Sequence, residues 1–256
     1  MMNDIFMESP KTARELYQMS YECYQTGLFE TSLEWIEKAI AAQEQDLSYF
    51  HLRGLILSKL QSYAKALQDF DRIIQYIATT KLLLEEEKSL EVPTLLGRVQ
   101  IYFQQKNYRG LIEDSQALLQ IQRNHWQAFF YRGIGHYFNQ TYQQALDDLE
   151  MAFYLSNEKD KVRPFRALVY YKHARYKLAQ ADFEIAVQQK PHDAVLWYNY
   201  GLNTYRMDLF ESALASFDTA LRLGLNTPQV YLYKGKTLQQ LGRYDEAEKC
   251  NSKINP

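Results

Sequence analysis

Apolar side chains recur along the chain in a pattern that repeats about every 34 residues. Successive copies of one aromatic position are 34 residues apart, except at one place, where the spacing is 45. A single insertion of 11 residues therefore interrupts an otherwise constant period. The seven members of this aromatic column are Phe29, Tyr63, Tyr108, Tyr142, Tyr176, Phe210 and Tyr244.

The positions around the aromatic column have the spacing of helices. Three residues after it, the side chain is small in six of the seven copies, as at Ala66 and Ala213. Apolar residues then continue at spacings of four and three, which is typical of an amphipathic helix. The segment before the column is also helical in periodicity and carries a second, mostly small position, as at Gly54 and Gly201. Each repeat is therefore predicted to be two closely packed helices, A and then B.

The repeat resembles the tetratricopeptide repeat, a 34-residue helix-turn-helix unit. The sixth copy matches best, with Trp197, Gly201, Phe210, Ala213 and Phe217 in the family's positions. The resemblance implies an all-α fold, a right-handed superhelical solenoid of antiparallel helix pairs that occupies residues 1–256 as one domain. The predicted units are 13–46, 47–79, 92–125, 126–159, 160–193, 194–227 and 228–256.

Two units depart from the pattern. In the third, Leu111 replaces the small residue and Ser115 replaces the large one, which suggests a compensated exchange of large and small side chains with less regular packing. In the last, Asn251 replaces the aromatic residue within a strongly polar segment. A solvated terminal helix accounts for this polarity, because the ends of a repeat stack need polar caps.

The insertion occupies about residues 77–91, and its leucines and glutamates favour extra helix over a loop. One interpretation is a lengthened helix B with a solvated acidic face. The other is a protrusion that contacts a partner.

The resemblance also implies that helix A lines the concave surface, where tetratricopeptide proteins bind partners. Tyr is the commonest residue at the inward positions, and Tyr and Arg are enriched at interface hot spots. Many of these rings could instead pack between neighbouring helices. The predicted partner-binding residues are Tyr17, Tyr21, Tyr24, Phe130, Tyr131, Ile134, Tyr137, Lys161, Leu168, Tyr171, Lys172, Tyr198, Asn199, Leu202, Tyr205, Arg206, Tyr233 and Lys236.

Charge adds one local feature. The formal net charge is only -2, so a basic field over the whole surface, as expected of a nucleic-acid-binding protein, is excluded. The fifth helix A and its flanks nevertheless concentrate positive side chains, which would form a solvated face, hold an acidic protein segment or bind single-stranded nucleic acid. They are Lys159, Lys161, Arg163, Arg166, Lys172, Arg175 and Lys177.

Several classes lack support in the sequence. The five histidines are scattered, and there is no HExxH, phosphate-binding glycine loop or nucleophile elbow, so neither enzyme activity nor a cofactor or metal is expected. The two cysteines are too few for a disulfide framework. Residues 1–10 lack the basic and apolar segments of a secretion signal, and no apolar run is long enough to span a membrane. A cytoplasmic location is therefore expected.

These observations predict a protein-interaction scaffold or adaptor that binds a peptide or partner helix in a Tyr-rich concave groove. The Lys and Asn columns of the carboxylate clamp, with which co-chaperone members of the family hold heat-shock chaperones, are not matched. An RNA-binding protein and a peptide-sensing regulator remain alternatives, although nucleic acid is the less expected ligand. Self-association through the acidic insertion or the terminal helices is a further possibility.

Overall fold

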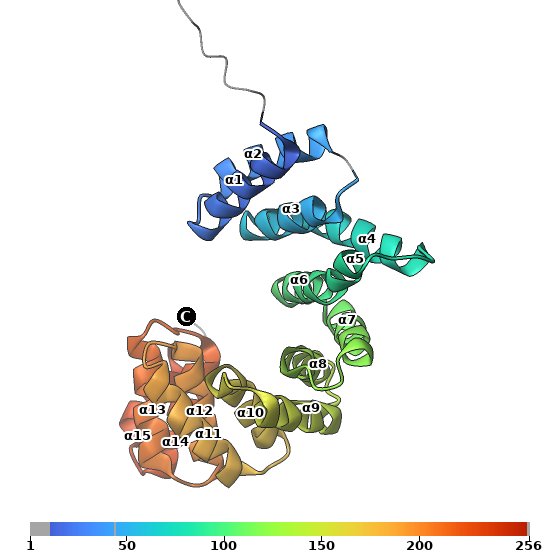
Figure 1. Ribbon diagram of the computed structural model, residues 1–256. Helices are drawn as coiled ribbons and strands as arrows, with labels where there is room; N and C mark the ends of the chain where they lie inside the picture. The colour runs from blue at the N-terminus through green and yellow to red at the C-terminus, as the bar shows by residue number, and fades with distance from the viewer. Residues whose placement is uncertain (1–10, 44, 255–256) are drawn as a thin grey trace, which may run out of the picture. The chain divides into compact units, whose positions relative to one another are not determined.

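A computed structural model describes residues 11–43 and 45–254, which contain fifteen helices and no strand. The helices follow one another as antiparallel hairpins (Figure 1). The expected all-α fold of consecutive helix pairs is confirmed. Residues 1–10, from which the absence of a secretion signal was predicted, lie outside the described residues.

The chain divides into two compact units. Unit 1 ends at Arg123 and contains three A–B pairs, α1 with α2, α3 with α4 and α6 with α7, together with the short α5. Its helices are α1 (Ala13–Gln25), α2 (Phe29–Ala42), α3 (Leu47–Lys59), α4 (Tyr63–Thr79), α5 (Glu85–Ser89), α6 (Glu91–Gln104) and α7 (Tyr108–Ile121).

Unit 2 begins at Asn124 and contains four A–B pairs. That all seven pairs form one solenoid domain stays a prediction. The helices of unit 2 are α8 (Trp126–Phe138), α9 (Tyr142–Leu155), α10 (Lys159–Lys172), α11 (Tyr176–Gln189), α12 (Ala194–Arg206), α13 (Phe210–Arg222), α14 (Pro228–Gln240) and α15 (Tyr244–Asn251).

The aromatic column is the first residue of helix B in all seven pairs. In four pairs its ring packs on an aromatic side chain five residues earlier, at the end of helix A, with ring centroids 5.8–5.9 Å apart. Two residues before the column, the backbone has a positive φ in every pair, as at Gly27, Gln140 and Ala174. This left-handed residue lets the chain reverse between helices A and B, and the ring then closes the turn.

Helices A and B approach closely where a small residue of helix A, such as Gly54 or Gly201, faces a large residue sixteen positions later on helix B, such as Phe70 or Phe217. A Cβ atom built on Gly201 would lie 2.7 Å from the ring of Phe217, and one built on Gly54 would lie 2.5 Å from the ring of Phe70. The third pair carries Val99 and Ser115 at these two positions, and both are fully buried. Leu111, the large member of the expected exchange with Ser115, is also fully buried on helix B, and the exchange itself stays a prediction.

A buried ion pair, which the hydrophobic pattern does not reveal, also joins helices A and B. An arginine on helix A and an aspartate sixteen residues later on helix B pair in four consecutive repeats. In three of them, the guanidinium donates two hydrogen bonds of 2.6–2.8 Å to the carboxylate. The pairs are Arg53–Asp69, Arg98–Asp114, Arg132–Asp148 and Arg166–Asp182.

The insertion contains extra helix, as its composition predicts, and contact of this segment with a partner stays a prediction. Helix α4 has 17 residues and ends at Thr79, and the short α5 follows after a non-helical segment. Leu83 and Leu90 pack against the core of unit 1. At the other end of the chain, Asn251 is exposed on the eight-residue α15.

Candidate partner-binding face

The A helices of unit 2 lie next to one another. Contacts join α8 with α10, α10 with α12, and α12 with α14, whereas successive B helices make no contact of this extent among the described residues. Helices on the inner side of a curved stack are closer together than those on the outer side. The A helices therefore form the inner face of unit 2.

Five tyrosines of this face, one each from α8, α10 and α14 and two from α12, form what we call the tyrosine wall: Tyr137, Tyr171, Tyr198, Tyr205 and Tyr233. The ring of Tyr233 meets the rings of Tyr198 and Tyr205 edge-on, with centroids 6.5 and 5.9 Å apart. Each of the five side chains is partly buried, so each presents only part of its ring to a partner.

The hydroxyl groups of the tyrosine wall are close enough to influence one another. Burial raises the pKa of Tyr198 to about 12, and the hydroxyls of Tyr233 and Tyr171 add to this rise. Burial also raises the pKa of Tyr137, with contributions from Tyr142 and Tyr171. Tyr198 and Tyr137 therefore stay uncharged at neutral pH and offer rings and hydroxyl groups rather than phenolates.

Exposed cations border the tyrosine wall. Lys172 lies 5.8 Å from the ring centre of Tyr142, and Lys236 lies 5.3 Å from that of Tyr233. A hydrogen bond with the Tyr171 side chain raises the pKa of Arg206, which keeps the guanidinium charged. Helices α8, α12 and α14 contain no Asp or Glu. The face is therefore aromatic and positively charged, although the whole chain is nearly neutral.

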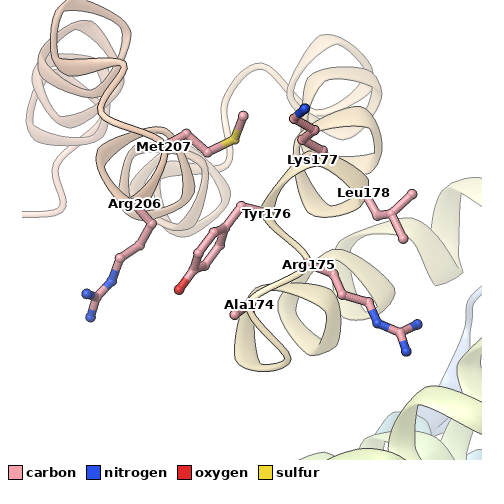
Figure 2. A pocket seen from close by; sticks show the side chains of 7 residues that line it. All are labelled: Ala174, Arg175, Tyr176, Lys177, Leu178, Arg206 and Met207. Atoms are coloured by element: carbon pink, nitrogen blue, oxygen red, sulfur yellow. The ribbon is translucent and has the colours of Figure 1, made fainter.

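A shallow hollow of about 560 Å³ lies where the turn between α10 and α11 meets the end of α12. In Figure 2, Tyr176 and Arg206 point in the same direction, while Met207 reaches toward Lys177. This volume is within the range of about 300–1,000 Å³ that is common for ligand sites. The lining residues are Ala174, Arg175, Tyr176, Lys177, Leu178, Arg206 and Met207.

A fully buried asparagine holds the lining of this hollow together. The side-chain amide of Asn203 donates to the backbone carbonyl of Tyr176 at 3.1 Å and contacts the sulfur of Met207 at 3.6 Å. Sequence reasoning did not select Asn203, Tyr176 or Met207. The membership of Tyr176 in the aromatic column was the available signal, but the column was used only to define the repeat.

Three further predicted tyrosines, Tyr17, Tyr21 and Tyr24, lie in unit 1. The ring of Tyr17 stacks on those of Tyr21 and Tyr49, with centroids 6.5 and 5.2 Å apart, and Tyr24 packs on Phe29. Tyr17 and Tyr24 also pack against the core of unit 1. These three tyrosines form a separate cluster within their own unit.

Two predicted contact residues are in the core instead. Ile134 is fully buried, and Phe130 is 8% exposed with its ring edge-on to Phe165 at 5.5 Å. Both side chains lie beneath the face, because these positions of α8 point toward neighbouring helices. Four other predicted residues are partly buried on α8, α10 and α12: Tyr131, Leu168, Asn199 and Leu202.

The seven cations of the predicted basic run differ in their contacts. Arg166 and Arg163 pair with the buried Asp182, and Lys161 pairs with Glu158. Lys159 lies 5.0 Å from the ring centre of Phe153. Lys172, Arg175 and Lys177 remain exposed near the hollow. The fold thus uses two of the seven cations in a buried ion pair and leaves the other five exposed, and the role of these five stays a prediction.

The part of the chain that the structure describes contains no cluster of three His, Cys, Asp or Glu side chains that could hold a metal ion. Within the same residues, no helix is both long and apolar enough to cross a membrane.

Comparison with known proteins agrees with the helix pairs. The family profile described as "Tetratricopeptide repeat" matches residues 204–252. Human tetratricopeptide repeat protein 16 is 21% identical over 222 residues, which are 84% of this chain but only 22% of that protein. The chain thus spans about a fifth of the length of this relative.

Solved structures share the fold. A tetratricopeptide repeat protein from Parabacteroides merdae aligns with a TM-score of 0.65 at 18% identity, covering 94% of this chain and 92% of that one. MamA from Desulfovibrio magneticus aligns with a TM-score of 0.57 at 17% identity, covering 64% and 93% of the two chains.

The fold and its inner face define a class, the helical-repeat proteins, in which stacked helix pairs present an extended surface. The 34-residue period and the profile match specify the family further. Residues 204–252 match the tetratricopeptide repeat family, and the chain has the fold of tetratricopeptide repeat proteins. Proteins of that family generally act as scaffolds for protein–protein interaction.

Proposed function

We propose that the chain is a non-enzymatic, cytoplasmic scaffold that binds a peptide or partner helix on the A-helix face of unit 2. The main support is the tyrosine wall, in which rings from four successive A helices lie on one face. Rigid rings of this kind cover a large contact area at a small cost in conformational entropy.

The charges around the wall favour an acidic partner segment. Lys172, Arg206 and Lys236 are exposed at its border, and three of its four helices carry no carboxylate. Complementary charges of this kind increase the association rate and exclude partners of the same sign. The pairing of Arg163 and Arg166 with Asp182 argues against RNA, because fewer unpaired cations remain to contact phosphates.

The test is affinity capture from a lysate of the source organism, with wild-type protein beside Tyr198→Ala/Tyr205→Ala. The matched control is Tyr154→Ala/Tyr244→Ala, because these two tyrosines are 78% and 69% exposed on B helices. We expect a protein that the wild type and the control retain and the first variant loses. Circular dichroism shows whether each variant is folded.

A second variant avoids disturbing the ring contacts. Lys172→Glu/Arg206→Glu changes two exposed side chains and should release the same protein. Retention of identical proteins by all variants would exclude this face as the binding site. Retention of RNA with a steep dependence on salt would support the nucleic-acid alternative instead.

A further inference from the structure

We propose that the insertion of unit 1 docks into the hollow of unit 2 on a second copy of the chain. The docking segment, residues 82–87, consists of three leucines, of which two are exposed, followed by three glutamates. The receiving hollow combines apolar side chains with three cations. The proposal extends the proposed function, because the hollow adjoins the same A-helix face.

The docking segment exposes an unusual amount of apolar surface. Leu82 is 92% exposed and Leu84 is 67% exposed, the highest values of any leucine among the described residues. Single exposed leucines are common on protein surfaces, but two that flank a partly buried third leucine form a small patch. Such a patch gains free energy when a partner covers it.

Contacts with the rest of unit 1 hold the docking segment in place. Leu83 packs into the core between the two exposed leucines. The carboxylate of Glu87 accepts hydrogen bonds from the backbone amide of Leu84 at 2.8 Å and from the Tyr76 hydroxyl at 3.0 Å. Because the segment is ordered before binding, docking costs less conformational entropy than it would for a flexible loop.

The hollow complements this segment in both polarity and charge. Tyr176, Met207 and the half-exposed Leu178 offer an apolar surface for the leucines. Arg175, Lys177 and Arg206 surround it and would face Glu85 and Glu86, which are exposed. Opposite charges next to an apolar contact set the orientation of docking as well as its rate. The two surfaces differ, so the contact is heterologous and allows each copy to bind another.

The test is sedimentation of the purified full-length chain over a wide range of concentration. We expect the average mass of the wild type to increase with concentration and the effect to weaken at high salt. The docking variant Leu82→Ser/Leu84→Ser and the hollow variant Lys177→Glu/Arg206→Glu should each weaken association about tenfold or more. Leu28→Ser, at a leucine that is 57% exposed in another turn, is the matched control and should associate like the wild type.

Mixing the two variants tests the direction of the contact. The docking variant retains an intact hollow, and the hollow variant retains an intact docking segment, so an equimolar mixture should form a complex that neither forms alone. Combining Glu85→Lys/Glu86→Lys with the hollow variant in one chain should restore association by reversing both charges.

A wild type that remains monomeric at all concentrations would overturn the proposal, as would variants that associate like the wild type. The result is independent of the proposed function, because sedimentation uses the purified chain alone. Partner capture by the docking variant then shows whether the tyrosine wall still works when self-association is lost.

Discussion

Glycine 201 shows how one position on helix A controls the distance to helix B. Helix A comes so close to Phe217 that no Cβ fits without a shift. Gly235 occupies the equivalent position in the last pair, where a Cβ would lie 3.2 Å from the side-chain oxygen of Asn251, which can move. The same substitution should therefore have opposite effects in the two pairs.

We predict that Gly201→Ala destabilises the chain by about 1–3 kcal/mol through overpacking. Gly235→Ala should be neutral or stabilise it by up to about 1 kcal/mol, because alanine is the better helix former. Urea denaturation followed by circular dichroism measures both. Equal losses for the two variants would show that the ring contact does not set the requirement for glycine.

His51 predicts a dependence of stability on pH. Its ring lies in unit 1 with Nδ1 3.1 Å from the hydroxyl of Thr94, and desolvation lowers its pKa from 6.5 to about 4. Between these values the unfolded chain binds the proton and the folded chain does not, so stability falls as the pH falls below 6.5. Asp114 acts in the opposite direction, because burial raises its pKa to about 6.

Comparing His51→Gln with the wild type isolates the contribution of His51, because both proteins keep Asp114. Between about pH 7 and pH 5, the free energy of unfolding of the variant should rise relative to the wild type by about 2 kcal/mol. Urea denaturation at both pH values measures this change. The same substitution at the exposed His192 is the control and should leave the difference near zero.

At the scale of elements, the Arg–Asp pairs join helices A and B within a repeat. The two hydrogen bonds between Arg132 and Asp148 are 2.7 and 2.8 Å long, and the aspartate side chain is 8% exposed. The ion pair between Asp218 on α13 and Lys234 on α14, which joins two successive repeats, is also short, at 2.5 Å, but its aspartate side chain is 50% exposed. Burial makes the first pair more sensitive to the loss of a charge.

Asp148→Asn should destabilise the chain by about 1.5–3 kcal/mol, because it leaves a largely buried guanidinium without its anion. Asp218→Asn should cost less than about 1 kcal/mol, as is usual for solvated ion pairs. Chemical denaturation of the two variants beside the wild type makes the comparison. A larger loss for Asp218→Asn would contradict this account of the pairs.

The whole molecule consists of two compact units, and the four helix pairs of unit 2 contain the complete tyrosine wall. In repeat proteins each pair is stabilised by its neighbours, and about three repeats suffice for a stable stack. We predict that a fragment of residues 124–256 folds alone, with a helical circular dichroism spectrum and a cooperative urea transition. A fragment without cooperative unfolding would show that unit 2 depends on unit 1.

Much of the fold could be predicted from the sequence, because the same pattern of aromatic, small and large residues occurs in successive copies along the chain. Phe29, Tyr63 and their equivalents recur at a constant period, and the spacing of small and large residues then indicates paired helices. The candidate site was less predictable. Tyr198, Tyr205 and Tyr233 lie together as expected, whereas Ile134 is fully buried although it was read from the same helix A positions.

The sequence by itself determined the helix pairs, their close approach and the abundance of tyrosine on helix A, because helical periodicity depends on local backbone geometry. Only the tertiary structure decided which cations remain exposed. Arg166 is held by Asp182, sixteen residues away, while Lys172 stays in solvent near the tyrosine wall. The reason is physical: a charged side chain is neutralised by whatever packs beside it, and neighbours across two helices are set by packing rather than by position along the chain.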